Sequence, residues 1–297
     1  MNETLASSDV TVVIPTYNGA DEILDSLASA AQARVARIIV VDNASTDGTA
    51  HLAATSEFAC DVVRLAHNSG FGAACNEGAK RANTPLLLFL NQDARILEGL
   101  DHAVSALQEN PHAGIAGAAM YSSQGGFRPS VYRFPTLPSV ALKRLSLAGG
   151  HFRSGDMDSP AYEVDYVEAS FLLVRSSVWR HLGGMDERYF MYGEERDFCY
   201  RARALGHKTL YVSRARYVHD GGYVASRAPL VAQGQWRFLS DHSSGARGMT
   251  LRGVFYSKLA VLRLMSTLRQ MLAPNSTTAA SAASRARETL HLVKETH

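Results

Sequence analysis

Four short apolar runs recur along the first third of the chain, and each ends in polar or turn-forming residues. They are VTVVIP at 10–15, RIIVVD at 37–42, CDVVRL at 60–65 and PLLLFLN at 85–91. Their hydrophobicity is continuous rather than alternating, which is typical of strands buried on both faces of a largely parallel sheet. Helical segments are predicted between them, at about 20–33, 47–56 and 72–82. This alternation predicts an α/β fold with a Rossmann-like, mostly parallel central sheet and helices on both faces.

The pattern changes after residue 121. A helix near 98–109 and a strand at 113–121 precede an irregular stretch, 122–160. This stretch is rich in glycine and proline and is predicted to form loops and short helices over an opening. Strand character returns at 162–175, and 208–222 is predicted as an edge strand ending at His219. Residues 274–284 are predicted as a low-complexity linker before a short helical tail.

Composition narrows the class of protein. A chain of 297 residues with 46% hydrophobic content can bury one large core or two smaller ones. A net charge of +2 is too small to indicate a nucleic-acid partner. The three cysteines are far apart and form no CxxC motif, which favours reduced thiols over a zinc site. The first ten residues lack a signal-peptide pattern and no apolar run is long enough to span a bilayer, so we expect a cytoplasmic location.

Polar segments follow the predicted strands, at the sheet edge where open α/β sheets bind ligands. They are PTYNGA at 15–20, DNASTDGT at 42–49, NSGFGAACNEG at 68–78 and NQDARI at 91–96. A dinucleotide-dependent dehydrogenase is a rival interpretation, in which Asp42 would hold a ribose hydroxyl. That class requires a glycine-rich turn after the first strand, and this chain has PTYNG there. The dehydrogenase interpretation is therefore disfavoured.

Together with VDYVEASFLLVR (164–175) and FMYGEERDFCYRARALGH (190–207), these segments resemble family 2 inverting glycosyltransferases, most closely the bacterial rhamnosyltransferase-like branch. The resemblance covers residues 10–222. It implies a GT-A fold, a nucleotide-sugar donor and a divalent metal, Mg²⁺ or Mn²⁺. We therefore predict a catalytic domain over 1–222, with a nucleotide-sugar half at about 1–121 and an acceptor half at about 122–222. A helical extension is predicted over 223–297.

The resemblance implies a set of donor-binding positions. They are Pro15, Thr16, Asn18, Asp42, Asn43, Asn68, Gly72, Asn76, Asn91 and Gln92. For Asp42 and Asn43 a turn that caps the next helix is the structural alternative. For 68–78 the alternative is a tight turn with a helix start, and the two interpretations are compatible.

Asp93 stands in the place of the family's DxD metal motif and is the carboxylate that remains there. One carboxylate with diphosphate oxygens and water suits Mg²⁺ or Mn²⁺. His219 resembles a histidine that some members place on the same metal. An exposed loop histidine is the alternative for His219.

Glu194, Glu195 and Asp197 begin a predicted helix, where acidic residues interact favourably with the helix dipole. The family pattern at this place supplies the base that deprotonates the acceptor hydroxyl, and it maps onto Glu195. Because a glutamate replaces the family's aspartate, Glu194 remains an alternative, and Asp197 is expected to orient the acceptor or the loop.

Residues of the VDYVEAS segment are expected at the acceptor or sugar. Asp165 resembles a residue that contacts hydroxyls there, and Glu168 is assigned to the same site. Ala169 stands where the family prefers glycine, a departure that leaves the donor sugar open.

The segment from Arg247 to Met271 holds five basic residues and no acidic one. An imperfect apolar face, which includes Leu251 and Phe255, predicts peripheral contact of 247–272 with the inner face of the cytoplasmic membrane. A core-docking helix or a homo-oligomer contact is the alternative.

These observations predict a metal-dependent, inverting glycosyltransferase of cell-envelope biosynthesis. The expected reaction moves L-rhamnose from dTDP-rhamnose to a hydroxyl of a polysaccharide or lipid-linked glycan. A hexosyl- or galactofuranosyltransferase that uses a UDP-sugar is the alternative within the class. A nucleotidyltransferase or a non-catalytic nucleotide-sugar-binding protein is the alternative outside it.

Overall fold

A computed structural model of the protein describes residues 4–136, 139–140, 161–221 and 225–296, and these divide into two compact units. The sheet unit holds residues 4–133, 161–190 and 194–221. The helical unit holds residues 134–136, 139–140, 191–193 and 225–296. Most of the predicted loop region lies at 137–138 and 141–160, outside the described residues.

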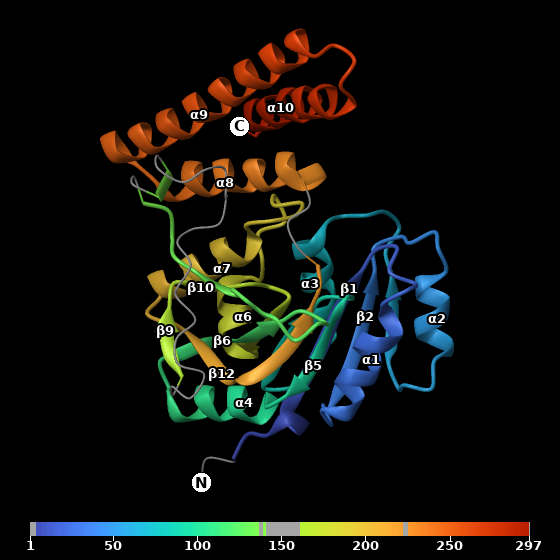
Figure 1. The fold of residues 1–297 in the computed structure, drawn as a ribbon. Coiled ribbons are helices and arrows are strands. Elements are labelled where there is room, and N and C mark those ends of the chain that lie inside the picture. Colours follow the sequence, from blue (N-terminus) through green and yellow to red (C-terminus); the bar gives the residue numbers. More distant parts are fainter. Residues whose placement is uncertain (1–3, 137–138, 141–160, 222–224, 297) are drawn as a thin grey trace. The chain divides into compact units, whose positions relative to one another are not determined.

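The main sheet has ten strands among the described residues, and its main path runs in the order β3-β2-β1-β4-β11-β6-β12-β5 (Figure 1). Strands β3, β2, β1 and β4 are parallel, β11 is antiparallel to both neighbours, and β12 is parallel to β6 and antiparallel to β5. The strands are β1 (Val10–Thr16), β2 (Arg37–Asp42), β3 (Asp61–Arg64), β4 (Leu86–Leu90), β5 (Ala94–Glu98), β6 (Ala113–Tyr121), β7 (Phe127–Arg128), β9 (Tyr162–Val164), β11 (Phe171–Arg175) and β12 (Lys208–His219). A separate small sheet pairs β8 (Val131–Tyr132) with β10 (Tyr166–Val167).

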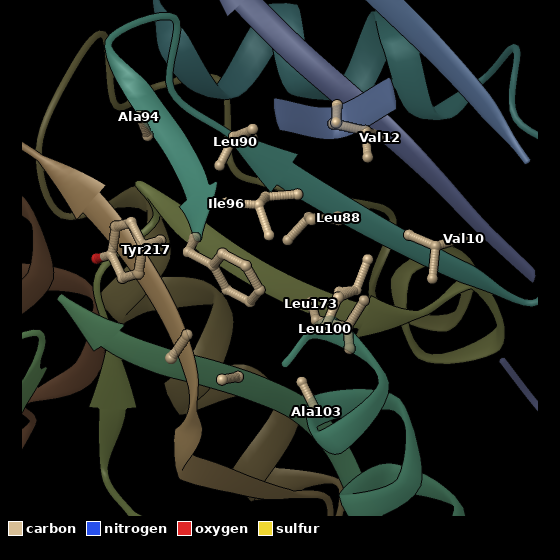
Figure 2. Packing of buried hydrophobic residues seen from close by; sticks show 14 of the residues in the cluster. Val10, Val12, Leu88, Leu90, Ala94, Ile96, Leu100, Ala103, Leu173 and Tyr217 are labelled. Atoms are coloured by element: carbon tan, nitrogen blue, oxygen red, sulfur yellow. The ribbon is translucent and has the colours of Figure 1, made fainter. Parts of the chain in front are cut away.

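Helices cover both faces of the main sheet. They are α1 (Ile23–Gln32), α2 (Thr49–Thr55), α3 (Phe71–Ala79), α4 (Leu100–Glu109), α6 (Ser176–Leu182) and α7 (Glu194–Ala204), with a 3₁₀ turn, η1, at Ser7–Asp9. On one face, alternate residues of β1 and β4 pack with β5, β12 and α4. Figure 2 shows Val10, Val12, Leu88, Leu90 and Ile96 converging there with Leu100. This layer holds a large apolar cluster of buried residues.

The opposite face is closed by α3, α6 and α7. The ring of Phe89 in β4 lies 4.3 Å from that of Trp179 in α6, and Trp179 lies 4.8 Å from Phe198 in α7. Because α7 is held against the sheet by this aromatic stack, its acidic first turn has a fixed position. The packing of apolar residues therefore places the carboxylates.

The four strands predicted from the apolar runs are confirmed as β1 to β4. The prediction of an edge strand at 208–222 is wrong, because β12 pairs with β6 on one side and with β9 and β5 on the other. Strand β5, which lies at the edge, was not predicted. The predicted strand at 162–175 is divided among β9, β10 and β11, which have different partners.

The helical unit contains a 3₁₀ turn, η2 (Ala225–Arg227), and the helices α8 (Ala228–His242), α9 (Gly245–Leu272) and α10 (Thr277–Glu295). Its core joins Trp236 of α8 to Phe255 of α9 and Leu290 of α10. Leu251 and Phe255, which were predicted to face the membrane, are buried in this core instead. No helix in the described ranges has the length and hydropathy to cross a bilayer.

The linker predicted at 274–284 is largely helical. Its alanine-rich sequence favours a helix, and the Ser276 hydroxyl caps α10 by accepting the Ala279 amide at 3.2 Å. Leu290 and Val293, near the C-terminal end of α10, are buried. The prediction of a low-complexity linker is therefore wrong. The composition is also typical of linkers, but here a cap and packing stabilise the segment as a helix.

Candidate active site

Loops from separate parts of the sequence meet at the carboxyl ends of the parallel strands. Thr16, at the end of β1, donates from Oγ1 to Gln92 Oε1 at 2.6 Å, and the Tyr17 amide donates to the same oxygen at 2.8 Å. Gln92 therefore joins the loop after β4 to the loop after β1. Pro15 is buried in β1 beside β2, so it can shape this site only through its backbone, whereas the buried Thr16 acts through its hydroxyl on Gln92.

Asp42 ends β2 and is completely buried. Its Oδ1 accepts the Ser45 amide at 3.2 Å and so closes a turn. The predicted helix cap at Asp42 is wrong, because α2 begins only at Thr49, whose amide donates to Asp47 instead. Its Oδ2 has no hydrogen bond, and the Nε of Arg64, an exposed residue of β3, lies 3.6 Å away. A buried carboxylate oxygen without a hydrogen bond can accept one from a ligand. The turn and a ligand contact are thus compatible at Asp42.

Two asparagines hold the neighbouring loops together. Asn18, which has a left-handed backbone (φ 48°), accepts the Thr46 amide on Oδ1 at 2.9 Å. Asn43 is buried, donates to the Gly70 carbonyl at 3.2 Å and accepts the Ser69 amide at 3.3 Å. Both side chains therefore connect consecutive loops of the predicted donor site.

The 68–72 segment lies directly beside the start of α7. Asn68 Oδ1 accepts the Gly70 amide at 3.0 Å. Gly70 has φ +91°, and a Cβ there would lie 2.2 Å from the Phe190 carbonyl oxygen, so glycine is required. A Cβ at Gly72 would lie 3.7 Å from the Cβ of Glu194. The predicted donor segment and the acidic helix start are therefore neighbours.

The side chain of Asn76 hydrogen-bonds to the segment at Met185 and Glu187. Its Nδ2 donates to the Met185 carbonyl at 2.8 Å and to Glu187 Oε1 at 2.9 Å, while its Oδ1 accepts the Met185 amide at 2.9 Å. Asn76 is also buried. Its contact with the donor stays a prediction, and its position fixes the turn that leads into α7.

Asp93 and His219 lie together where β4 and β12 end. The Nε2 of His219 lies 3.2 Å from Asp93 Oδ1 and 3.3 Å from Asn91 Nδ2. Burial lowers the pKa of His219, but the hydrogen bond and the charge of Asp93 outweigh it, so the pKa is raised. His219 is only 6% exposed, which does not fit the alternative of an exposed loop histidine.

The residues around this pair fit a divalent cation. A Cβ at Gly221 would lie 2.4 Å from Asp93 Oδ2 and 2.4 Å from His219 Nε2, so glycine keeps the space before both ligand atoms clear. Arg128 Nη1 donates to the carbonyls of residues 219–221 at 2.9–3.3 Å and fixes that segment. A carboxylate with one imidazole is a donor set for Mn²⁺ or Mg²⁺ completed by diphosphate oxygens. Among the described residues, no group of three or more His, Cys, Asp or Glu side chains is placed to hold a metal ion.

The three carboxylates of α7 have different environments. Asp197 is buried and pairs with Arg201, whose Nε lies 2.7 Å from Asp197 Oδ2. Glu194 is 4% exposed, and its Oε2 has no hydrogen bond. Burial, and then the charge of Glu195, raises the pKa of Glu194 well above its ordinary value. Glu195 is the partly exposed member of the three.

Glu168 connects the acidic helix start to the Asp93–His219 pair. It follows β10, and the Tyr132 hydroxyl lies 3.5 Å from its Oε2. Burial raises the pKa of Glu168 to about 7, His219 opposes that rise, and Glu195 adds to it. These couplings place Glu168 within electrostatic reach of both Glu195 and His219.

Asp165 lies in an ion pair instead. Its Oδ1 is 2.7 Å from Arg203 Nη1 on α7, and the carboxylate is partly exposed. A role of Asp165 toward an acceptor stays a prediction.

Sequence reasoning missed Arg128, Tyr132 and Gly221. Arg128 and Tyr132 lie in short strands of an irregular stretch that carries no motif, so no local signal indicated them. Gly221 could have been found from the DGG that follows the long strand at His219, because glycine after a strand often marks close backbone approach.

Comparison with known proteins identifies the family. The profile of the family described as "Glycosyl transferase family 2" matches residues 11–168, more than half of the chain. The N-acetylglucosaminyl-diphospho-decaprenol L-rhamnosyltransferase of Mycobacterium tuberculosis is 29% identical over 291 residues, covering 87% of this chain and 94% of that protein. The pre-mycofactocin glycosyltransferase of the same organism is 31% identical over 217 residues, covering 71% of this chain and 43% of that protein.

A solved structure shares the fold. The mannosyltransferase PcManGT from Pyrobaculum calidifontis, in complex with GDP-Man and Mn²⁺, has a TM-score of 0.56 at 15% identity, and the match covers 97% of this chain and 86% of that one. The predicted GT-A fold is confirmed. The chain therefore belongs to glycosyl transferase family 2 and is a glycosyltransferase.

Proposed function

We propose that this glycosyltransferase moves L-rhamnose from dTDP-rhamnose to a hydroxyl of a cell-envelope polysaccharide or lipid-linked glycan, with inversion at the anomeric carbon. Support for the sugar and for a lipid-linked acceptor comes from the rhamnosyltransferase relative, which matches 87% of this chain. Support for the site comes from Asp93 and His219, whose Oδ1 and Nε2 atoms lie 3.2 Å apart beside the space that Gly221 leaves clear. That geometry is the observation that carries the proposal, since it gives a candidate metal pair at the strand ends.

Glu195 is proposed as the base that takes the proton of the acceptor hydroxyl. A base needs a carboxylate that is charged and can be reached by the acceptor. Asp197 is committed to Arg201, and burial disfavours the charged form of Glu194. Glu195 is partly exposed. Proton removal increases the nucleophilicity of the acceptor oxygen as it attacks the face opposite the nucleotide.

Asp93 and His219 are proposed to hold the metal, Mg²⁺ or Mn²⁺. The bound cation would supply charge compensation for the departing diphosphate. The other loops at the strand ends bind the nucleotide, and Asp42 Oδ2 accepts a hydrogen bond from it. Arg128 keeps residues 219–221 in place so that the backbone of Gly221 borders the diphosphate.

Peripheral contact with the inner face of the cytoplasmic membrane is proposed for the second half of α9. Its apolar side chains are exposed and recur at helical spacing: Val261, Leu264, Met265, Leu268, Met271 and Leu272. Basic residues and no acidic ones accompany them along 247–271. A basic, apolar helix face suits a surface of anionic lipid. Such contact would bring the enzyme to a lipid-linked acceptor.

The test is release of nucleoside diphosphate from dTDP- and UDP-sugars, with Mg²⁺ or Mn²⁺ and a membrane lipid extract. Glu195→Gln is expected to lower kcat by about 10²–10⁴. Glu194→Gln is the matched control and is expected to retain activity, since it replaces a carboxyl that burial already keeps from ionising. The product from dTDP-rhamnose should have the anomeric configuration opposite to the donor.

Other results would change the proposal in defined ways. Release from a UDP-sugar alone would reject rhamnose as the donor sugar. Nucleotide binding without release from any donor would reject catalysis. Equal activity of the wild type and Glu195→Gln, with loss in Glu194→Gln, would move the base to Glu194.

A further inference from the structure

An apolar groove lies within the helical unit, between α8, α9 and α10. Its volume is about 680 Å³, within the range of about 300–1,000 Å³ that is usual for small-molecule sites. Small and apolar side chains from all three helices line it, including Ala232, Leu259, Leu262, Met265, Leu272 and Ala282. The proposed glycosyl transfer does not use this groove.

The groove is continuous with the exposed apolar side of α9. Met265 and Leu272 line the groove, yet they are 47% and 86% exposed. Leu264 and Leu268 lie next to them on the helix and are also exposed. Apolar surface left in water is unfavourable, and a continuous exposed patch usually marks an interaction site. An apolar ligand could therefore enter the groove from this side.

Positive charge accompanies the groove. Arg269 of α9 and Arg285 of α10 are among its lining residues, and none of the residues that line it is acidic. Arg263 is a further basic residue of α9. A purely apolar partner would gain nothing from two guanidinium groups. A hydrocarbon chain that carries an anionic phosphate would match both the apolar lining and the two arginines.

We propose that the groove binds one hydrocarbon chain of an anionic membrane phospholipid, whose phosphate is held by Arg269 and Arg285. The choice of a membrane lipid as the occupant rests on the proposed transfer to a cell-envelope acceptor. The groove and its charges do not depend on that activity. A lipid bound in the groove would anchor the protein to the membrane, in addition to the proposed contact of the exposed α9 face with the membrane surface.

The test is calorimetric titration of the full-length protein with monomeric dihexanoyl phosphatidylglycerol. We expect saturable binding at one lipid per chain. Dihexanoyl phosphatidylcholine, with the same chains and no net charge, should bind about tenfold more weakly. Inorganic phosphate alone should not bind measurably, because it leaves the apolar lining unfilled.

Three variants separate groove binding from adsorption to the surface. Ala282→Trp fills the groove and should abolish binding. Arg269→Gln is at an exposed position and should weaken binding of phosphatidylglycerol about tenfold while leaving phosphatidylcholine unchanged. Leu264→Ser changes an exposed residue outside the lining and should bind as the wild type does. Circular dichroism and the thermal midpoint check that each variant is folded.

Several outcomes would overturn the inference. One is unchanged lipid binding in folded Ala282→Trp and Arg269→Gln, and another is equal affinity for the two phospholipids. A dimer in analytical ultracentrifugation that Ala282→Trp converts to a monomer would assign the groove to a second copy of the chain. Because the titration contains no sugar donor, loss of lipid binding and loss of glycosyl transfer are separate results.

Discussion

Glu168→Gln tests the electrostatics of the candidate site through folding stability. Glu168 lies after β10, largely out of water and near the charges of Glu195 and His219. Burial is the main cause that raises its pKa from 4.5 to about 7. The neutral glutamine has nearly the same shape as the protonated glutamate. The substitution should therefore remove the titration and leave the packing in place.

The sign of the effect follows from proton linkage. The folded state holds the Glu168 proton up to about pH 7, whereas the unfolded state releases it near pH 4.5. Stability from this group is present below pH 4.5 and is lost as the pH rises through 7. A rise of the pKa from 4.5 to about 7 corresponds to about 3 kcal/mol as an upper bound, at about 1.4 kcal/mol per unit.

The assay is urea unfolding of wild type and Glu168→Gln at pH 4.5 and pH 8, with EDTA present so that no cation binds at His219. At pH 4.5 the two proteins should have equal free energies of unfolding, and at pH 8 the variant should be more stable by up to about 3 kcal/mol. Titrating groups that are not coupled to Glu168 cancel in the difference, and the couplings to His219 and Glu195 are part of the measured effect. Glu163→Gln, which breaks an exposed pair with Lys208, is the matched control and should change stability by less than about 1 kcal/mol.

The reasoning about Glu168 fails if the difference between wild type and variant changes by less than about 0.5 kcal/mol from pH 4.5 to pH 8. Glu168 would then ionise as it does in water. A variant that is less stable at both values by the same amount would indicate lost packing rather than an altered titration.

Three further substitutions separate structural roles from ligand contacts. Asn76→Ala should lower the free energy of unfolding by at least about 2 kcal/mol in urea melts, because it leaves buried backbone groups unpaired at about 1–3 kcal/mol each; a change below 1 kcal/mol would contradict this role. Asp165→Asn loses only its partly exposed pair with Arg203 and should cost less than about 1 kcal/mol, so a tenfold loss of activity without a stability change would indicate an acceptor contact. Gly221→Ala places a Cβ 2.4 Å from His219 Nε2 and should weaken Mn²⁺ binding, measured by electron paramagnetic resonance of free Mn²⁺ with dTDP present; unchanged affinity would place the cation elsewhere.

The apolar runs predicted the parallel half of the sheet because each strand there carries its own signal, although β3 is partly exposed rather than buried on both faces. Strand β5 begins directly after Asp93 and pairs with β12, more than a hundred residues later in the sequence. Nothing local in ARILE specifies that partner, so β5 was missed and β12 was wrongly placed at the edge. Pairing between distant segments is decided by the tertiary core, and a single strand's pattern does not contain it.

The sequence indicated which residue types lie at the strand ends, but it could not indicate their partners. Asn76 and Asn43 have the polarity expected of donor ligands, yet their amides bind the protein's own backbone. Asp42 combines both possibilities, since one oxygen closes a turn and the other has no hydrogen bond. Hydrogen-bond partners far apart in sequence depend on loop geometry. Residue type alone therefore overestimates the number of side chains available to a ligand.

Three carboxylates begin α7, and burial gives each a different chemistry. An aromatic stack through Phe198 holds the helix against the sheet, so Glu194 and Asp197 face the interior. Asp197 meets Arg201 there, whereas at Glu194 burial outweighs the opposing charge of Arg196. Glu195 lies partly in solvent and is the carboxylate that an acceptor can reach in the proposed reaction. The acidic pattern is common to many helix starts, and the packing of α7 is what favours Glu195 over its neighbours as the proposed base.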